Sequence, residues 1–439
     1  MDLLTFLKVA NEYYLGIPAT LIFLSVGIIL TIKTGFLQIR AFPRFLSFLR
    51  KGVSRSKEGN IKTISSLHAM FAAMATSMGM GSIIGPSIAI ITGGPGALFW
   101  LVAYTFFGGI TRFTEVTFAM HTRKKTEEGN IISGPVQYLK LVHKWVANWY
   151  GWVMIILFAI WSGLQSNTLA SILAKENVST WYVGLALAVI VSVVLHGGAK
   201  RVGFVASKLV PIMFFSYLAF SLLIVFRDIS ALKHALYLVF SNIFSAGPVI
   251  GGVAGGFALT AMRAGIYRSI YITEAGLGTS SIPHSMADTA KGTDQGLLSM
   301  YSIFADGFLS FISGMLILVT GMWLTQGPDI SSTLVYDVFK MNSPTLGKFV
   351  LLVSITLFVT TTVIGNSFNG VQSFASFTKH RFLSFYKIFT ILIIFFGASM
   401  SVPLIWQLVD FIITFVAIPN VISLAILAFK KPEVLKVVD

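Results

Sequence analysis

Small and polar residues interrupt an otherwise apolar stretch, 71–95, which reads FAAMATSMGMGSIIGPSIAIITGGP. Thr76, Ser77, Gly79 and Pro86 lie in its interior. A helix that only crosses lipid gains nothing from them, because Gly costs about 1 kcal/mol and Pro about 3 kcal/mol relative to Ala. Backbone freed from helical pairing is tolerated in a membrane where protein or a wet cavity satisfies it. The stretch predicts a broken helix of the kind that forms transporter sites. Close helix packing through small residues is the alternative.

Side chains suited to binding an ion or a zwitterion gather in two further apolar segments. They are Ser162, Gln165, Ser166, Asn167 and Thr168 in one segment, and Thr360, Thr361, Thr362, Asn366 and Ser367 in the other. Hydroxyl and carbonyl oxygens suit a hard cation such as sodium. Residues 362 and 366 lie one helical turn apart on one face. For each residue alone, a hydrogen bond between helices is the simpler explanation.

The high hydrophobic content and the low charged content of the chain are typical of an integral membrane protein. The chain has 439 residues, of which 55% are hydrophobic and 11% charged, whereas soluble domains are about 25% charged. It has no Cys, which excludes disulfides, iron–sulfur clusters and thiolate metal sites. Its seven His show no HxxxH or HExxH spacing. We expect an integral membrane protein that is not an enzyme and has no cofactor. The N-terminus lacks a basic region followed by a cleavage site, so no signal peptide is expected.

The elements that must position these residues are about eleven apolar segments of spanning length. They are approximately 13–32, 62–90, 94–118, 146–173, 179–196, 203–225, 236–262, 298–324, 346–370, 384–401 and 403–429. We therefore predict an all-α polytopic membrane protein that forms a single transporter domain over 1–439. Residues 13–32 form a leading helix, and the other helices divide into 62–225 and 236–429.

The distribution of the positive charges predicts the orientation. The chain carries 32 Lys and Arg, and they collect in alternate loops if the N-terminus is outside and the C-terminus inside the cell. The exceptions that fall outside are Lys8, Lys175, Arg227, Lys233, Lys340 and Lys348. This asymmetry is typical of cytoplasmic loops, which are enriched in Lys and Arg. It explains the net charge of +15 through the lipid bilayer, without nucleic acid as a partner.

A second glycine-rich segment, 242–262, predicts a second broken helix, because it holds Gly247, Pro248 and Gly251 among other small residues. It opens the second group of five helices as 62–90 opens the first, in the opposite orientation. This predicts a five-plus-five inverted repeat, in which paired broken helices flank a binding site. The following segment, 263–296, is expected to be an internal loop.

Charged residues near membrane depth are rare and usually face the protein interior. We interpret Arg112, Glu115 and Glu274 as an inner-gate or packing network. Asp306 is a candidate proton or ion site, with a satisfied polar contact as the alternative.

Several motifs resemble the alanine/glycine–cation symporter family of bacterial amino acid carriers. They are GMGSIIG at 79–85, GGPGA at 93–97, RFTEVT at 112–117, LQSN at 164–167, RSIYITEAGLGTSSIPHS at 268–285 and VAIPN at 416–420. They occur in order over most of the chain. Three positions depart from the family pattern: Met80 replaces Thr, Ser82 replaces Asn and Asn366 replaces a pocket Trp.

The resemblance implies a LeuT-like fold with the substrate between the two breaks. It places the amides of Gly79, Met80 and Gly81 at the substrate carboxylate, with Gln165, Phe257, Thr362 and Asn366 around the remainder. It places sodium between the carbonyls of Ala75 and Met78 and the hydroxyls of Thr361 and Thr362.

The expected function is symport of sodium with a small neutral amino acid, such as alanine or glycine, across the bacterial inner membrane. The alternatives are proton coupling, a larger or more polar amino acid, and an ion channel. An enzyme using Glu274 is a further alternative, but no metal cluster or Ser/His/Asp set accompanies that residue.

Overall fold

Helices form almost all of the regular structure in this computed structural model, which describes residues 2–54, 63–125, 131–244, 260–324, 333–378 and 381–437. The long helices are α2 (Gly16–Lys33), α7 (Ala97–Thr122), α9 (Lys144–Ala174), α11 (Gly198–Arg227), α15 (Gly292–Val319), α17 (Leu346–Thr378) and α19 (Val402–Lys430). The shorter helices are α1 (Leu3–Val9), α3 (Leu37–Arg40), α4 (Phe42–Lys51), α5 (Ser66–Ser77), α6 (Met80–Gly93), α8 (Pro135–Leu139), α10 (Thr180–Leu195), α12 (Ile229–Ser241), α13 (Thr260–Thr273), α14 (Ser281–His284), α16 (Leu334–Asn342) and α18 (Leu383–Gly397). The remaining elements are a π-helical turn (Ala10–Leu15), two 3₁₀ turns (Met322–Leu324 and Pro432–Leu435) and the antiparallel strands β1 (Lys124–Lys125) and β2 (Ile131–Ile132).

Six described helices are long and apolar enough to cross a membrane: α2, α9, α11, α15, α17 and α19. The pair α5 and α6 reaches the same length and hydropathy together, bent by 41° at the break between them. The prediction of a helical, multi-span membrane protein is confirmed at this level. The count of about eleven spans and the inverted repeat stay predictions.

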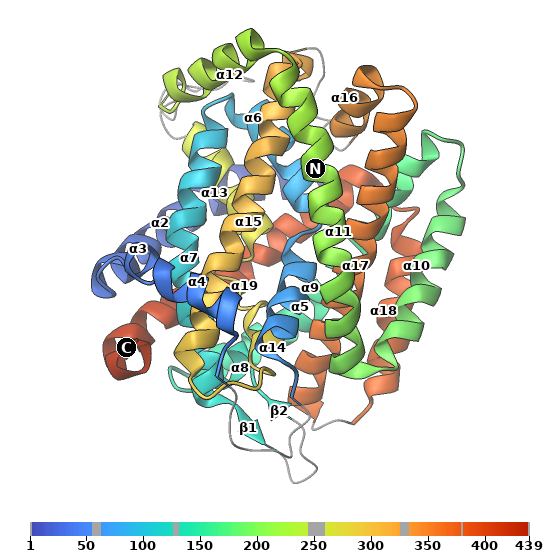
Figure 1. Cartoon of the computed structure of the whole chain (residues 1–439). Coiled ribbons are helices and arrows are strands. Elements are labelled where there is room, and N and C mark those ends of the chain that lie inside the picture. The colour runs from blue at the N-terminus through green and yellow to red at the C-terminus, as the bar shows by residue number, and fades with distance from the viewer. Residues whose placement is uncertain are drawn as a thin grey trace.

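Most of the long helices run between two ends of the molecule (Figure 1). α12 lies across one end, and the β1–β2 hairpin lies at the other; we name these the α12 end and the hairpin end. α7 packs along α15, and α9 packs along α17. These four helices, with α5, α6 and α13, surround the residues that the sequence marks as candidate site residues.

The first interruption lies between α5 and α6, as the sequence predicts. The Ser65 side chain caps the start of α5 by accepting a hydrogen bond from the His68 amide. α5 ends at Ser77, and Gly79 adopts an extended conformation (φ −111°, ψ −159°) before α6 begins at Met80. The chain therefore leaves helical geometry at the Gly-rich motif, which frees backbone groups inside the bundle.

A second interruption within the described residues lies at 274–279, and we name it the second break; it is separate from the broken helix that the sequence predicts at 242–262. The predicted broken helix at 242–262 lies largely in 245–259, outside the described residues. The expectation that 263–296 begins as a loop is wrong, because α13 extends to Thr273 and packs against α6 and α7. The helix stops there because Glu274, Gly276 and Gly278 adopt positive φ angles of 53°, 94° and 83°. Positive φ favours Gly and ends a right-handed helix.

Ion pairs join residues 175 and 176, after α9, to α16 and to the start of α17 at the α12 end (Figure 1). Glu176 accepts hydrogen bonds from Lys348 Nζ, at 2.8 Å, and from the Tyr336 hydroxyl. Lys175 Nζ lies 2.9 Å from the Asp337 carboxylate. The pKa of the Glu176 carboxyl is lowered, because Lys348 and then Tyr336 hydrogen-bond to its charged form. Burial, followed by the contact with Glu176, raises the pKa of Tyr336 to about 12.

Acid is expected to weaken this cluster through Glu176. A carboxyl with a lowered folded pKa stabilises the fold fully above its unfolded value, about 4.3, and loses that contribution as the pH falls through the folded value. Glu176→Gln should therefore reduce the acid-induced fall in the thermal midpoint below about pH 4.3. The control is Glu433→Gln, at an exposed residue of the C-terminal turn, which should keep the wild-type pH profile. Identical profiles for all three proteins would contradict the role of Glu176.

Candidate functional site

The first break brings backbone groups of α5 and α6 against side chains of α9 and α17. The amide of Met80 donates a hydrogen bond to Gln165 Oε1 at 3.2 Å. The Thr362 hydroxyl lies 3.4 Å from the Met78 carbonyl oxygen. A Cβ atom at Gly79 would lie 2.8 Å from Thr362 Oγ1 and 3.2 Å from Gln165 Oε1. The structure thus brings together four residues that are predicted for the substrate, Gly79, Met80, Gln165 and Thr362, with Met78, which is predicted for sodium.

The amides at the break have partners within the protein. The Gly79 amide donates to the Ser77 carbonyl at 2.9 Å, and the Met80 amide donates to Gln165. Because α6 starts at this point, its dipole and first-turn amides favour a negative group there. A carboxylate entering the break would replace Gln165 Oε1 as the acceptor for the Met80 amide.

The residues predicted for sodium are brought together in part. The Met78 carbonyl and the Thr362 hydroxyl meet across α5 and α17, and Ala75 is buried on α5. The Thr361 hydroxyl instead donates within α17, to Leu357 O at 2.9 Å and Phe358 O at 3.0 Å. Thr361 Oγ1 also lies 3.4 Å from Met213 Sδ of α11, and its oxygen keeps lone pairs that could bind a cation.

Gly81 lies in the first turn of α6, and Asn366 is buried on α17 one turn after Thr362, whereas Phe257 lies outside the described residues. A Cβ at Gly81 would lie 2.7 Å from Cε1 of Tyr271, so the α13 ring packs directly over α6. Trp161 Nε1 donates to the Tyr271 hydroxyl at 2.8 Å, and the rings of Tyr271 and Trp406 lie 5.3 Å apart. These three aromatic residues, from α9, α13 and α19, cover the break.

Buried side chains hold the second break from several helices. The Glu274 carboxylate accepts hydrogen bonds from Thr279 and, at 3.3 Å, from Thr76 at the end of α5. Tyr104 donates to the Ala275 carbonyl at 3.2 Å. Because Thr76 lies near the first break, the Thr76–Glu274 contact links the two interruptions directly.

Glu115 and Asn420 fix the glycines of the second break. Asn420 Nδ2 donates to Glu115 Oε1 at 2.9 Å and to the Gly276 carbonyl at 2.8 Å. Tyr138 completes the set by donating to Asn420 Oδ1 at 2.7 Å.

Arg112 binds the end of α13 and faces Asp306. Its Nη1 donates to the Thr273 carbonyl at 3.0 Å, and its Nε donates to Ser299 Oγ at 3.2 Å. Arg112 Nη1 also lies 3.6 Å from Asp306 Oδ2, and both side chains are fully buried. The predicted network of Arg112, Glu115 and Glu274 therefore surrounds the second break, with Asp306 as the ion-pair partner of Arg112.

Sequence reasoning missed the aromatic residues over the first break and Asn420 at the second. Asn420 lies in the VAIPN motif, so a signal for it was present in the sequence. Tyr271 and Trp161 carried no signal, because aromatic residues are frequent throughout the apolar segments. Their role depends on α13 packing against α6 and on the hydrogen bond from Trp161 to Tyr271, which their sequence positions do not reveal.

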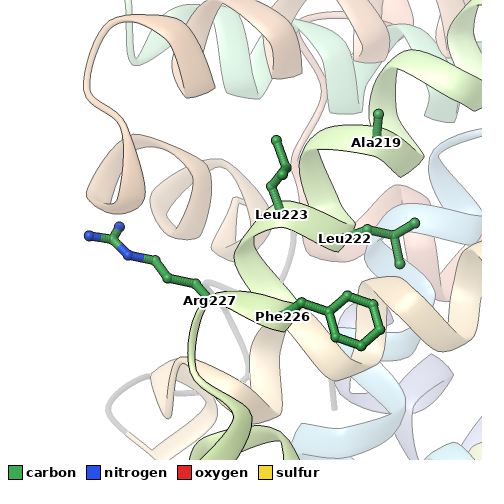
Figure 2. A pocket seen from close by; sticks show the side chains of 5 residues that line it. All are labelled: Ala219, Leu222, Leu223, Phe226 and Arg227. Carbon is green, nitrogen blue, oxygen red and sulfur yellow. The ribbon is translucent and has the colours of Figure 1, made fainter.

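An open pocket on α11 is unrelated to the break (Figure 2). Its lining residues, Ala219, Leu222, Leu223, Phe226 and Arg227, all belong to one helix. A substrate site needs polar groups that converge from several elements, as they do at the first break and not here.

A family model, the sodium:alanine symporter family, matches residues 1–438. The chain belongs to the sodium:alanine symporter family. This confirms the family that the motifs indicate, and with it a transporter rather than an enzyme. It also confirms a multi-pass membrane protein with sodium as the coupling ion of its family.

Two relatives and one solved structure illustrate the range of similar proteins. The sodium/alanine symporter AgcS of Methanococcus maripaludis is 29% identical over 98% of this chain and 95% of its own length. The probable sodium/glutamine symporter GlnT of Bacillus subtilis is 30% identical over 96% of this chain and 87% of its own. The fold is similar to that of a substrate-bound Na⁺-coupled sialic acid symporter, with a TM-score of 0.54 and 11% identity over 91% of this chain and 82% of that one.

Proposed function

We propose that this protein carries a small neutral amino acid into the cell together with sodium, by alternating access. The observation that carries the proposal is the start of α6 at a buried break, where the Met80 amide, Gln165 and Thr362 converge. A zwitterion needs donors for its carboxylate, and the first turn of a helix supplies them without a buried Arg. Gly79, Gly81, Phe257 and Asn366 complete the proposed substrate site.

The proposed sodium site lies beside the substrate, between α5 and α17. Its ligands are the Ala75 and Met78 carbonyls and the Thr361 and Thr362 hydroxyls, which offer the oxygen atoms that hard cations prefer. Sodium entry provides sufficient energy, because one charge crossing 100 mV releases about 2.3 kcal/mol. That corresponds to about 50-fold accumulation of a neutral solute.

The proposed gate is the network around the second break. Arg112, Glu115 and Glu274 hold residues 274–279 through Thr273, Asn420 and Thr76. A rearrangement of the Thr76–Glu274 contact would couple movement of α5 to this segment.

The proposed topology is one domain over 1–439, with a leading helix at 13–32 and inverted repeats at 62–225 and 236–429. The hairpin end is cytoplasmic in the bacterial inner membrane, with the N-terminus outside and the C-terminus inside. The basic loops support this orientation through the enrichment of Lys and Arg on the cytoplasmic side.

Radiolabelled alanine uptake into proteoliposomes tests the function. Accumulation should require an inward sodium gradient and should exceed the level reached without a gradient. Uptake that persists unchanged in sodium-free vesicles clamped at constant pH would rule out sodium coupling. Sodium current without any amino acid would instead indicate an ion channel. Thermal stabilisation by each of the twenty amino acids, with and without sodium, identifies substrates other than alanine.

A further inference from the structure

Asn366 is a fully buried residue whose side-chain amide has no protein partner. Its exposed fraction is 0%, and neither Nδ2 nor Oδ1 forms a hydrogen bond with the described part of the chain. Asn369 shares this property, whereas two other buried asparagines donate through Nδ2: Asn167 to Gly397 O at 3.0 Å and Met400 O at 2.8 Å, and Asn420 to Glu115 Oε1 at 2.9 Å. A buried amide without partners is costly, so a group from outside the protein is expected to pair with Asn366.

The place of Asn366 on α17 puts it next to the proposed substrate site. It follows Thr362 by one helical turn on the same face of α17, and Thr362 contacts the break at Met78 and Gly79. α17 remains against α5 at this level, because a Cβ at Gly365 would lie 2.5 Å from Thr76 Cγ2. Four residues of helix advance about 6 Å along the axis. A substrate held at the break therefore reaches Asn366 with a side chain a few bonds long.

The chemistry of the Asn366 side chain selects the partner. Its amide offers donors at Nδ2 and an acceptor at Oδ1, whereas a carboxylate only accepts and an ammonium only donates. A side-chain carboxamide pairs with both atoms at once. The methyl group of alanine forms a hydrogen bond with neither Nδ2 nor Oδ1, and it is too short to reach Asn366 from the break.

We propose that Asn366 binds the side chain of the substrate and that neutral amino acids with a carboxamide, asparagine or glutamine, are preferred over alanine. This inference rests on the proposed function and specifies the substrate of the same site. A site that hydrogen-bonds a substrate group discriminates strongly against an analogue that lacks it. We expect asparagine or glutamine to bind at least about 10-fold more tightly than alanine.

Calorimetric titration of the purified full-length protein in sodium tests this preference. The ligands are alanine, asparagine, glutamine and aspartate, and the measured quantity is the ratio of each Kd to that of alanine. In Asn366→Leu, which keeps the branching and the number of side-chain heavy atoms and removes the amide, the advantage of asparagine and glutamine should disappear. The wild-type ratios alone test the inference, even if this variant does not fold.

The matched control is Asn369→Leu. Asn369 is also fully buried on α17 with an unpaired amide within the described structure. It lies roughly 10 Å along the helix from Thr362, beyond the reach of an amino acid held at the break. The Kd ratios should therefore equal those of the wild-type protein.

Two outcomes would overturn the inference. Equal affinity for alanine, asparagine and glutamine would show that water pairs with Asn366, and sodium-coupled transport of a neutral amino acid would still stand. The absence of binding by any amino acid, from folded protein in sodium, would overturn the proposed function as well.

Discussion

Arg112→Met is expected to destabilise the folded protein by about 3–5 kcal/mol, the cost of removing one partner from a buried ion pair. Arg112 and Asp306 are both fully buried, with 3.6 Å between Nη1 and Oδ2. The substitution leaves the Asp306 carboxylate without its cation and removes the donors to Thr273 O and Ser299 Oγ. The measurement is the free energy of unfolding from denaturant titration of the purified protein in detergent.

A double variant and a surface pair control this prediction. Arg112→Met with Asp306→Leu should recover part of the lost stability, because no uncompensated charge remains at that position. Lys175→Met breaks the partly exposed pair with Asp337, and it should cost no more than about 1 kcal/mol. Equal losses in Arg112→Met and Lys175→Met would show that the buried pair contributes no more than a surface pair.

Gly79→Ala is expected to reduce sodium-driven uptake by about 10- to 100-fold, since overpacking costs about 1–3 kcal/mol. The added methyl would lie 2.8 Å from Thr362 Oγ1 and 3.2 Å from Gln165 Oε1. Both groups line the proposed substrate and sodium sites, so the substitution displaces them together. The measurement is the initial uptake rate in proteoliposomes, normalised to the amount of folded protein.

Gly109→Ala is the matched control for Gly79→Ala. It also adds one methyl to a buried glycine, on α7, but the nearest atoms would be Met300 Cγ at 3.5 Å and Ile303 Cγ2 at 3.6 Å. These are ordinary van der Waals contacts, and uptake should stay near the wild-type rate. Unchanged uptake in Gly79→Ala would contradict the placement of the substrate at this break.

The sequence alone predicted the position of the first break and two of the polar side chains beside it, Gln165 and Thr362. Gly79 lies among residues that weaken a helix, and the chain leaves helical geometry there because the local cost of continuing is high. Gln165 and Thr362 were predictable for a related reason: polar side chains within apolar helices are expected to face the protein interior. The motifs around these residues also carried the family, which the match over 1–438 confirms.

Tertiary structure decided the second break and the polar groups that meet there. Residues 274–279 are polar and glycine-rich, so by composition they resemble an exposed loop. They are buried, and Tyr104 from α7 and Asn420 from α19 supply hydrogen-bond donors to their backbone carbonyls.

These partners are far from the break in sequence, and hydrophobic periodicity carries no information on pairing between distant helices. The same limit applies to Asn366, whose residue type is visible in the sequence and whose lack of a partner is not. Residue type and spacing thus determined where the chain can break, and packing between distant helices determined which break is buried and which polar atoms remain for a ligand.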